Sequence, residues 1–94
     1  MQPSRFTLEF DLPIAGNFQY AGLVIIDKQY VLRLHPTNSA AQHYFLDISV
    51  YINLATRAIE SVEAEDPSGY IYQVQLSNED KQFILATAGL QRGG

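Results

Sequence analysis

The chain contains no cysteine and no long apolar run, and its basic residues are few. The absence of cysteine excludes disulfides, thiolate metal sites and cysteine nucleophiles, so any catalysis would depend on serine, histidine, tyrosine or carboxylates. A membrane-spanning helix needs about 20 apolar residues in succession, and this sequence has no such stretch. A secretory leader has a basic start followed by an apolar stretch and a cleavage site, and the sequence shows no such pattern. We therefore expect a cytoplasmic protein that makes no membrane contact.

The charged side chains are unevenly balanced, because ten acidic and six basic residues give a net charge of −4. The basic residues lie singly along the chain, at Arg5, Lys28, Arg33, Arg57, Lys81 and Arg92. Binding to nucleic acid depends on clustered lysine and arginine that displace counterions from phosphates, so we expect no nucleic-acid partner. Acidic residues gather at Glu60, Glu63, Glu65 and Asp66. This stretch is typical of a solvated pair of strands, and it would also suit docking of a basic protein.

Length and composition predict one folded domain. Apolar residues make up 47% of the 94 positions, which is usual for a packed globule. A chain of this length has room for a single core. We expect one domain over residues 1–94, in which residues 90–94 form a flexible tail.

The alternation of apolar and polar residues predicts six β-strands. The alternation is clearest where Ile48 and Val50 are interleaved with Asp47 and Ser49, which is the period of two that marks a strand with one buried face. The segment 18–26 is apolar on both faces, so we expect that strand to be central or covered on both sides. Segment 36–42 has the composition of a loop. The predicted strands span residues 5–12, 18–26, 30–35, 44–53, 60–65 and 70–76.

The C-terminal part of the sequence has local signals for a turn and a helix. Asp66-Pro67-Ser68-Gly69 suits a tight hairpin turn in which Gly69 adopts a positive φ. Ser77 can begin a helix as its N-cap, and Gly89 can end it in the left-handed region. The stretch 54–62 fits both a helix and a turn followed by a strand, and we favour the turn and strand.

These elements predict a mainly β fold. We expect a six-stranded antiparallel meander that forms a small barrel or sandwich, with one C-terminal α-helix packed across an open end or face. The alternative is an α+β fold with a helix over Leu54 to Val62. From the alternation and the helical period, the predicted core consists of Phe6, Leu8, Phe10, Val24, Leu32, Leu34, Leu46, Ile48, Val50, Val62, Tyr72, Val74 and Phe83.

No set of residues predicts catalysis. His35, His43 and Asp47 flank one predicted loop, and together they would suit a metal ion or a general base. Their spacing matches no ligand pattern, and the serines lack the surroundings of an activated nucleophile. We therefore expect neither an enzyme nor a bound cofactor or metal.

Two short segments resemble parts of known families. Asp47-Ile48-Ser49 is similar to the DxSxxG signature of PilZ cyclic-dinucleotide-binding domains, which are also small β-barrels. Position 52 is Ile where that signature has Gly, and only Arg5 stands where PilZ domains have paired arginines, so the fragment does not identify a PilZ domain. The ending Leu90-Gln91-Arg92-Gly93-Gly94 resembles the diglycine tail of ubiquitin-like modifiers. That resemblance implies, as a remote alternative, conjugation through the terminal carboxylate.

The function that we expect is that of a non-catalytic protein-interaction module. Two predicted strands carry apolar second faces, and small β domains often bury such faces by self-association, so a homo-oligomer is expected. The alternative is a β-barrel that binds a small ligand in a preformed cavity. An apolar or acidic β surface would hold the protein partner, and the residues predicted for it are Leu23, Ile25, Phe45, Tyr51, Glu63 and Glu65.

Overall fold

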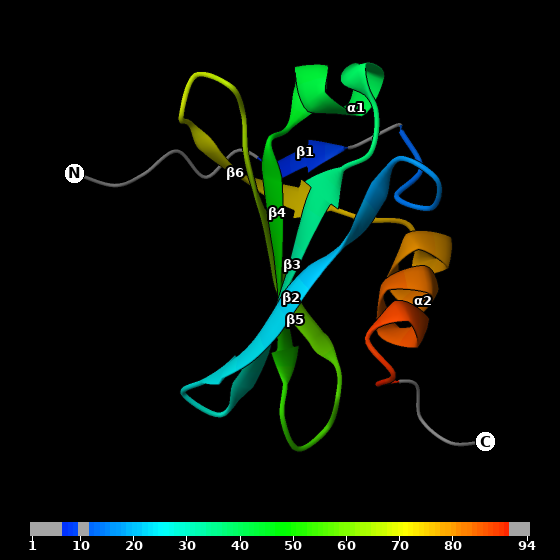
Figure 1. Ribbon diagram of the computed structural model, residues 1–94. Coiled ribbons are helices and arrows are strands. Elements are labelled where there is room, and N and C mark those ends of the chain that lie inside the picture. Colours follow the sequence, from blue (N-terminus) through cyan, green and yellow to red (C-terminus); the bar gives the residue numbers. More distant parts are fainter. Residues whose placement is uncertain (1–6, 10–11, 91–94) are drawn as a thin grey trace.

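The computed structural model describes residues 7–9 and 12–90, which form one β-sheet and two helices (Figure 1). Of residues 7–9 it describes the backbone. The elements, in chain order, are β1 (Thr7–Glu9), β2 (Phe18–Ile26), β3 (Gln29–Pro36), α1 (Ser39–Tyr44), β4 (Asp47–Asn53), β5 (Ile59–Glu65), β6 (Ile71–Gln75) and α2 (Asn78–Thr87).

The sheet is a single open layer with the strand order β1-β6-β5-β4-β3-β2. Strands β2 to β6 form an antiparallel meander, whereas β1 pairs with β6 in parallel. The prediction of a mainly β, antiparallel fold with a C-terminal helix is confirmed. The predicted barrel or sandwich is wrong: all six strands lie in one sheet, and its two edge strands, β1 and β2, do not pair with each other to close it. The stretch before β5 is a turn, as favoured from the sequence.

Helix α2 lies along one face of the sheet, and α1 lies at one end of it (Figure 1). The predicted cap of α2 is confirmed, because the Ser77 side-chain oxygen accepts a hydrogen bond from the Asp80 N–H at 3.1 Å. Asp80 is itself buried, and its Oδ1 accepts from the N–H of Ile14 at 3.1 Å. This bond fixes α2 against the loop that precedes β2.

The core lies between α2 and the sheet face that α2 covers. Six predicted core residues are buried, and two more, Tyr72 and Phe83, are partly buried and pack against the core. The six are Leu32, Leu34, Ile48, Val50, Val62 and Val74. Phe6 and Phe10 lie outside the described residues, as does the side chain of Leu8.

Two residues predicted for the core are exposed. Val24 is 51% exposed because it lies on the uncovered face of β2, where alternation places it opposite the core side. Leu46 is 41% exposed: it lies before β4, outside the strand whose alternation was used to assign it to the core. The predicted strand over 44–53 begins only at Asp47, since helix α1 replaces the expected loop and the start of that strand. The Asn38 side chain caps α1 by accepting from the Ala41 N–H at 2.8 Å.

Candidate functional site

Strand β2 is one edge of the sheet and carries four of the eight large apolar side chains that are exposed among the described residues. It spans nine residues, FQYAGLVII, without a charged residue or a proline. Edge strands normally carry lysine, proline, a bulge or other features that block pairing with further strands, and of these β2 has only an irregularity of register between Tyr20 and Gly22. The exposed side chains of β2 are Tyr20 at 50%, Val24 at 51%, Ile25 at 62% and Ile26 at 53%.

The β2–β3 hairpin owes its shape to a two-residue turn. Asp27 and Lys28 have φ values of 50° and 64°, and Ile26 pairs with Gln29 across the turn. Positive φ at both central residues is the requirement of a type I′ turn, whose twist matches that of the strands. The tip of this hairpin projects on the side away from α2 (Figure 1). The apolar residues near the tip are therefore outside the reach of the helix that covers the core.

The face of the sheet opposite α2 carries a shallow apolar row. Cross-strand pairing brings Val24, Val31 and Tyr51 side by side on β2, β3 and β4. Val31 is only 7% exposed although no helix of the described structure covers this face. A hollow of about 450 Å³ lies over the row, bounded also by Ile26 and Arg33. Val24 and Val31 were not among the residues predicted to bind a partner. The absence of charge throughout β2 is the signal that would have indicated Val24; Val31 lies on β3, beside Arg33, and has no such signal.

A polar row continues along the same face. Arg33 on β3 forms an ion pair with Asp47 on β4, and the hydrogen bond to Asp47 raises the pKa of Arg33. His35 Nε2 lies 3.7 Å from Asp47 Oδ1. His43 instead stacks edge-on against Tyr44, with ring centroids 6.2 Å apart. The three candidate ligands therefore do not converge, and no group of three potential metal ligands occurs in residues 7–9 and 12–90.

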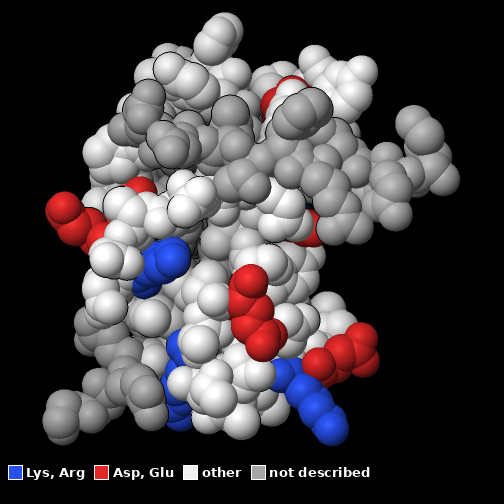
Figure 2. All heavy atoms as spheres, turned by 180° about the vertical axis from the view of Figure 1, so that it is seen from behind, with Lys and Arg blue, Asp and Glu red and all other residues white. Residues whose placement is uncertain are grey.

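The hydroxyl of Tyr51 donates a hydrogen bond to Glu63 Oε1 at 3.2 Å on the adjacent strand. Burial raises the pKa of Tyr51, and the nearby Glu63 carboxylate raises it further. Glu60 accepts hydrogen bonds from the side chains of Gln29 and Asn53, which lower the pKa of Glu60. Two of the three acidic side chains of β5, those of Glu60 and Glu63, are thus engaged by side chains of β3 and β4. In the view of Figure 2, acidic and basic groups are interspersed among uncharged residues.

The six residues predicted to bind a partner do not form one surface. Phe45 is only 2% exposed, so its prediction as a surface residue is wrong: it follows α1 and packs in the core, with its ring 6.3 Å from that of Tyr72. Register places Leu23 and Ile25 on the side of the sheet that α2 covers. Tyr51 and Glu63, which are partly buried, lie on the opposite side with the exposed Glu65; their role in binding stays a prediction.

The predicted diglycine tail at Gly93-Gly94 lies outside the described residues, as does most of the expected tail 90–94. No helix of the described residues has both the length and the apolar character needed to span a membrane. Comparison of the chain with protein-family models, with curated proteins and with solved structures gives no match.

Proposed function

We propose that this protein is a non-catalytic interaction module that binds an extended strand of a protein partner along the edge of β2. The observation that carries the proposal is the edge strand itself, nine residues without charge or proline. Addition of a strand to an open sheet edge supplies affinity through main-chain hydrogen bonds, and the side chains on either face supply specificity.

The hairpin register identifies the backbone groups that would take part. In a two-residue hairpin the residues that flank the turn, here Ile26 and Gln29, form a hydrogen-bonded pair. Hydrogen-bonded and non-hydrogen-bonded pairs alternate along an antiparallel ladder. The N–H and C=O groups of Ile25 and Leu23 therefore point away from β3, toward the free edge, where an added strand would meet them.

A second copy of the chain is the partner that we propose. Two β2 edges related by a twofold axis would pair antiparallel and join two sheets into one, and twofold dimers are the commonest assembly. Because β2 has no charged residue, the approach of two copies brings no like charges together within the strand. The pairing would also cover Ile25 and Val24, which are both more than half exposed in the single chain.

Light scattering at micromolar concentrations tests this proposal. We expect a mass near twice the 10.6 kDa of one chain. Ile25→Lys and Ile25→Pro should each give a folded monomer. Lysine places a charge on the edge that opposes pairing with a second strand, and proline removes an N–H that pairs with the second copy but forms no hydrogen bond with β3. Thr87→Lys adds the same charge at an exposed position on α2 and should leave the dimer intact. A wild-type mass of one chain throughout the range would contradict the proposal.

A further inference from the structure

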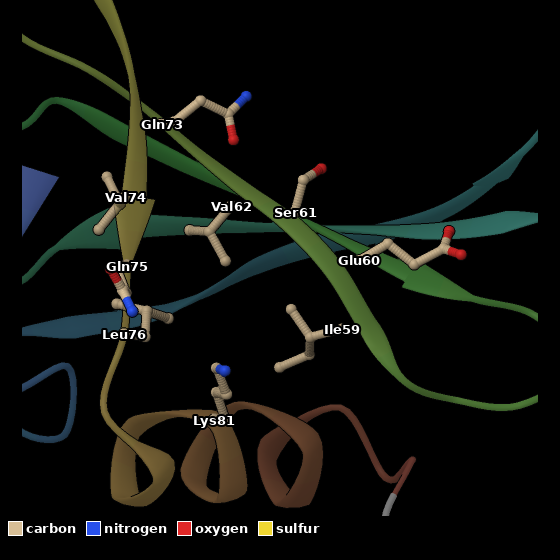
Figure 3. A pocket seen from close by; sticks show the side chains of 9 residues that line it. All are labelled: Ile59, Glu60, Ser61, Val62, Gln73, Val74, Gln75, Leu76 and Lys81. Carbon is tan, nitrogen blue, oxygen red and sulfur yellow. The ribbon is translucent and has the colours of Figure 1, made fainter. Parts of the chain in front are cut away.

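A hollow of about 230 Å³ opens between β5, β6 and α2, away from the β2 edge (Figure 3). Its apolar lining consists of Ile59 and Val62 on β5, Val74 on β6, and Leu76 just after β6. Three of these four residues, Val62, Val74 and Leu76, are buried and belong to the core. The hollow therefore reaches the margin of the hydrophobic core.

The hollow exists because the sheet splits at this point. Strand β6 pairs with β5 over only three residues, Glu63–Glu65, and then follows β1. Ile59, Ser61 and Val62 of β5 pair with β4 on one side, whereas Glu60 is bulged out of that register. On the other side, residues 59–62 have no register partner among the described residues. Figure 3 shows β5 and β6 diverging toward α2. This part of β5 is therefore a free edge in the interior of the strand order, in addition to the outer edges β1 and β2.

The orientation of the free backbone follows from the hairpin that joins β5 and β6. The Asp66 N–H donates to the Tyr70 carbonyl at 2.9 Å, so the backbone of Asp66 faces β6. Because successive residues of a strand face alternate neighbours, the backbone of every second residue back along β5 faces the same way. The alternation therefore directs the backbone groups of Val62 toward the side where β6 diverges, and it extends no further back because a bulge at Glu60 interrupts the register with β4.

The polar rim of the hollow has one cationic group. Lys81 extends from α2 into the opening (Figure 3), and no carboxylate of the described residues forms an ion pair with it. Glu60 also lines the hollow, but its side chain extends toward Gln29 and Asn53, and its carboxylate accepts hydrogen bonds from their side-chain amides. Gln73 and Gln75 provide uncharged amides along β6. A negatively charged group would thus meet Lys81, whereas the Glu60 carboxylate of the lining is already engaged by two side-chain amides.

We propose that this hollow is a second binding site, which takes an extended acidic segment of a partner protein. The segment lies along residues 59–62 of β5 and adds backbone hydrogen bonds to the free edge. One of its apolar side chains covers Val62 and Leu76, and an aspartate or glutamate side chain pairs with Lys81. The site is separate from the β2 edge and does not depend on the function proposed for that edge.

The probe for this site is a phage-displayed library of random linear heptapeptides, held between fixed linkers so that no free terminus is offered. The library is selected on immobilised wild-type protein, and the most enriched peptide is synthesised with blocked termini and a fluorescent label. We expect an acidic residue next to apolar residues in the enriched sequences. Amide resonances of residues 59–62 and 73–76 should shift when the peptide binds.

Two charge reversals distinguish the proposed site from general attraction. Lys81→Glu should weaken binding of the labelled peptide about tenfold or more, since the acidic side chain would then meet a like charge. Lys28→Glu makes the same change of net charge at the exposed β2–β3 turn and should alter binding less than about twofold. Circular dichroism of each variant confirms that it is folded. If no peptide is enriched, if Lys81→Glu binds as wild type does, or if the shifts fall on β2, the proposal is overturned.

Discussion

Strands β4 and β2 are both rich in apolar residues, yet they have opposite fates in the structure. In β4, Ile48, Val50 and Ile52 are 0% exposed. In β2, Ile25 is 62% exposed and Val24 is 51% exposed. Strand β4 has a neighbour on each side and α2 over one face, whereas β2 has one neighbour and a tip that projects away from α2 (Figure 1). Place in the sheet, and not hydropathy, decides which apolar side chains are buried.

The largest expected effect in this comparison is the replacement of two isoleucines by alanine, one in each strand. Ile48→Ala removes a fully buried side chain and should lower the free energy of unfolding by about 2–5 kcal/mol. Ile25→Ala makes the same chemical change at an exposed position and should lower it by less than about 0.5 kcal/mol. Urea denaturation, at a concentration too low for association, measures both.

Equal losses from the two alanine substitutions would contradict the comparison, because they would mean that β2 is as well covered as β4. A loss below about 0.5 kcal/mol for Ile48→Ala would show that the register of β4 is wrong, since a slip of one residue exchanges the two faces of a strand.

The turns of the two hairpins differ in the residue that adopts a positive φ. Gly69 has a φ of 91° between β5 and β6, whereas Lys28 has a φ of 64° between β2 and β3. Gly69→Ala should lower the free energy of unfolding by about 1 kcal/mol, because a Cβ is disfavoured in that region. Lys28→Gly should raise it by about 0.5–1 kcal/mol, because it removes the same penalty. Thermal or urea unfolding of both variants tests these signs, and a loss of stability in Lys28→Gly would contradict the type I′ turn.

Local patterns in the sequence predicted the parts of the fold that depend on local physics. The alternation in β4, the left-handed Gly69 and the Ser77 cap all lie where short-range sterics and hydrogen bonds determine the backbone. Helix α1 was missed because its six residues are too few for a helical period to stand out. The pairing of β1 with β6 brings together segments that are more than 60 residues apart in the sequence. No local pattern predicts which edge of a sheet such a strand will pair with.

The candidate site was predictable only in part. Leu23 and Ile25 were correctly placed on a strand with two apolar faces, but the sequence could not show that this strand forms an edge. Phe45 was misplaced because the alternation was extended back beyond the start of β4 at Asp47, to a residue that caps the end of α1. The hollow beside Lys81 exists because β6 diverges from β5 to pair with β1, and α2 then bounds the gap. The sequence could not predict the hollow, because it depends on how these four elements pack together.

The smallest expected effect on stability comes from Tyr51 of β4, which lies on the uncovered face of the sheet in one row with Val24 of β2. Its titration compares how far the two strands are exposed to solvent on that face. Its pKa in the folded protein is raised by burial and by Glu63. A raised pKa means that the folded state favours the neutral phenol, so the contribution of Tyr51 to stability is complete below its unfolded pKa of about 10. That contribution is lost as the pH rises through the folded pKa. The stability difference between wild type and Tyr51→Phe should therefore shift against the wild type when urea unfolding is repeated from about pH 9 to about pH 11. Glu63→Gln should reduce the shift, because it removes the negative charge while leaving an oxygen that can accept from the hydroxyl. A difference that stays constant over this range would mean that Tyr51 is as open to solvent as the apolar residues at the β2 edge.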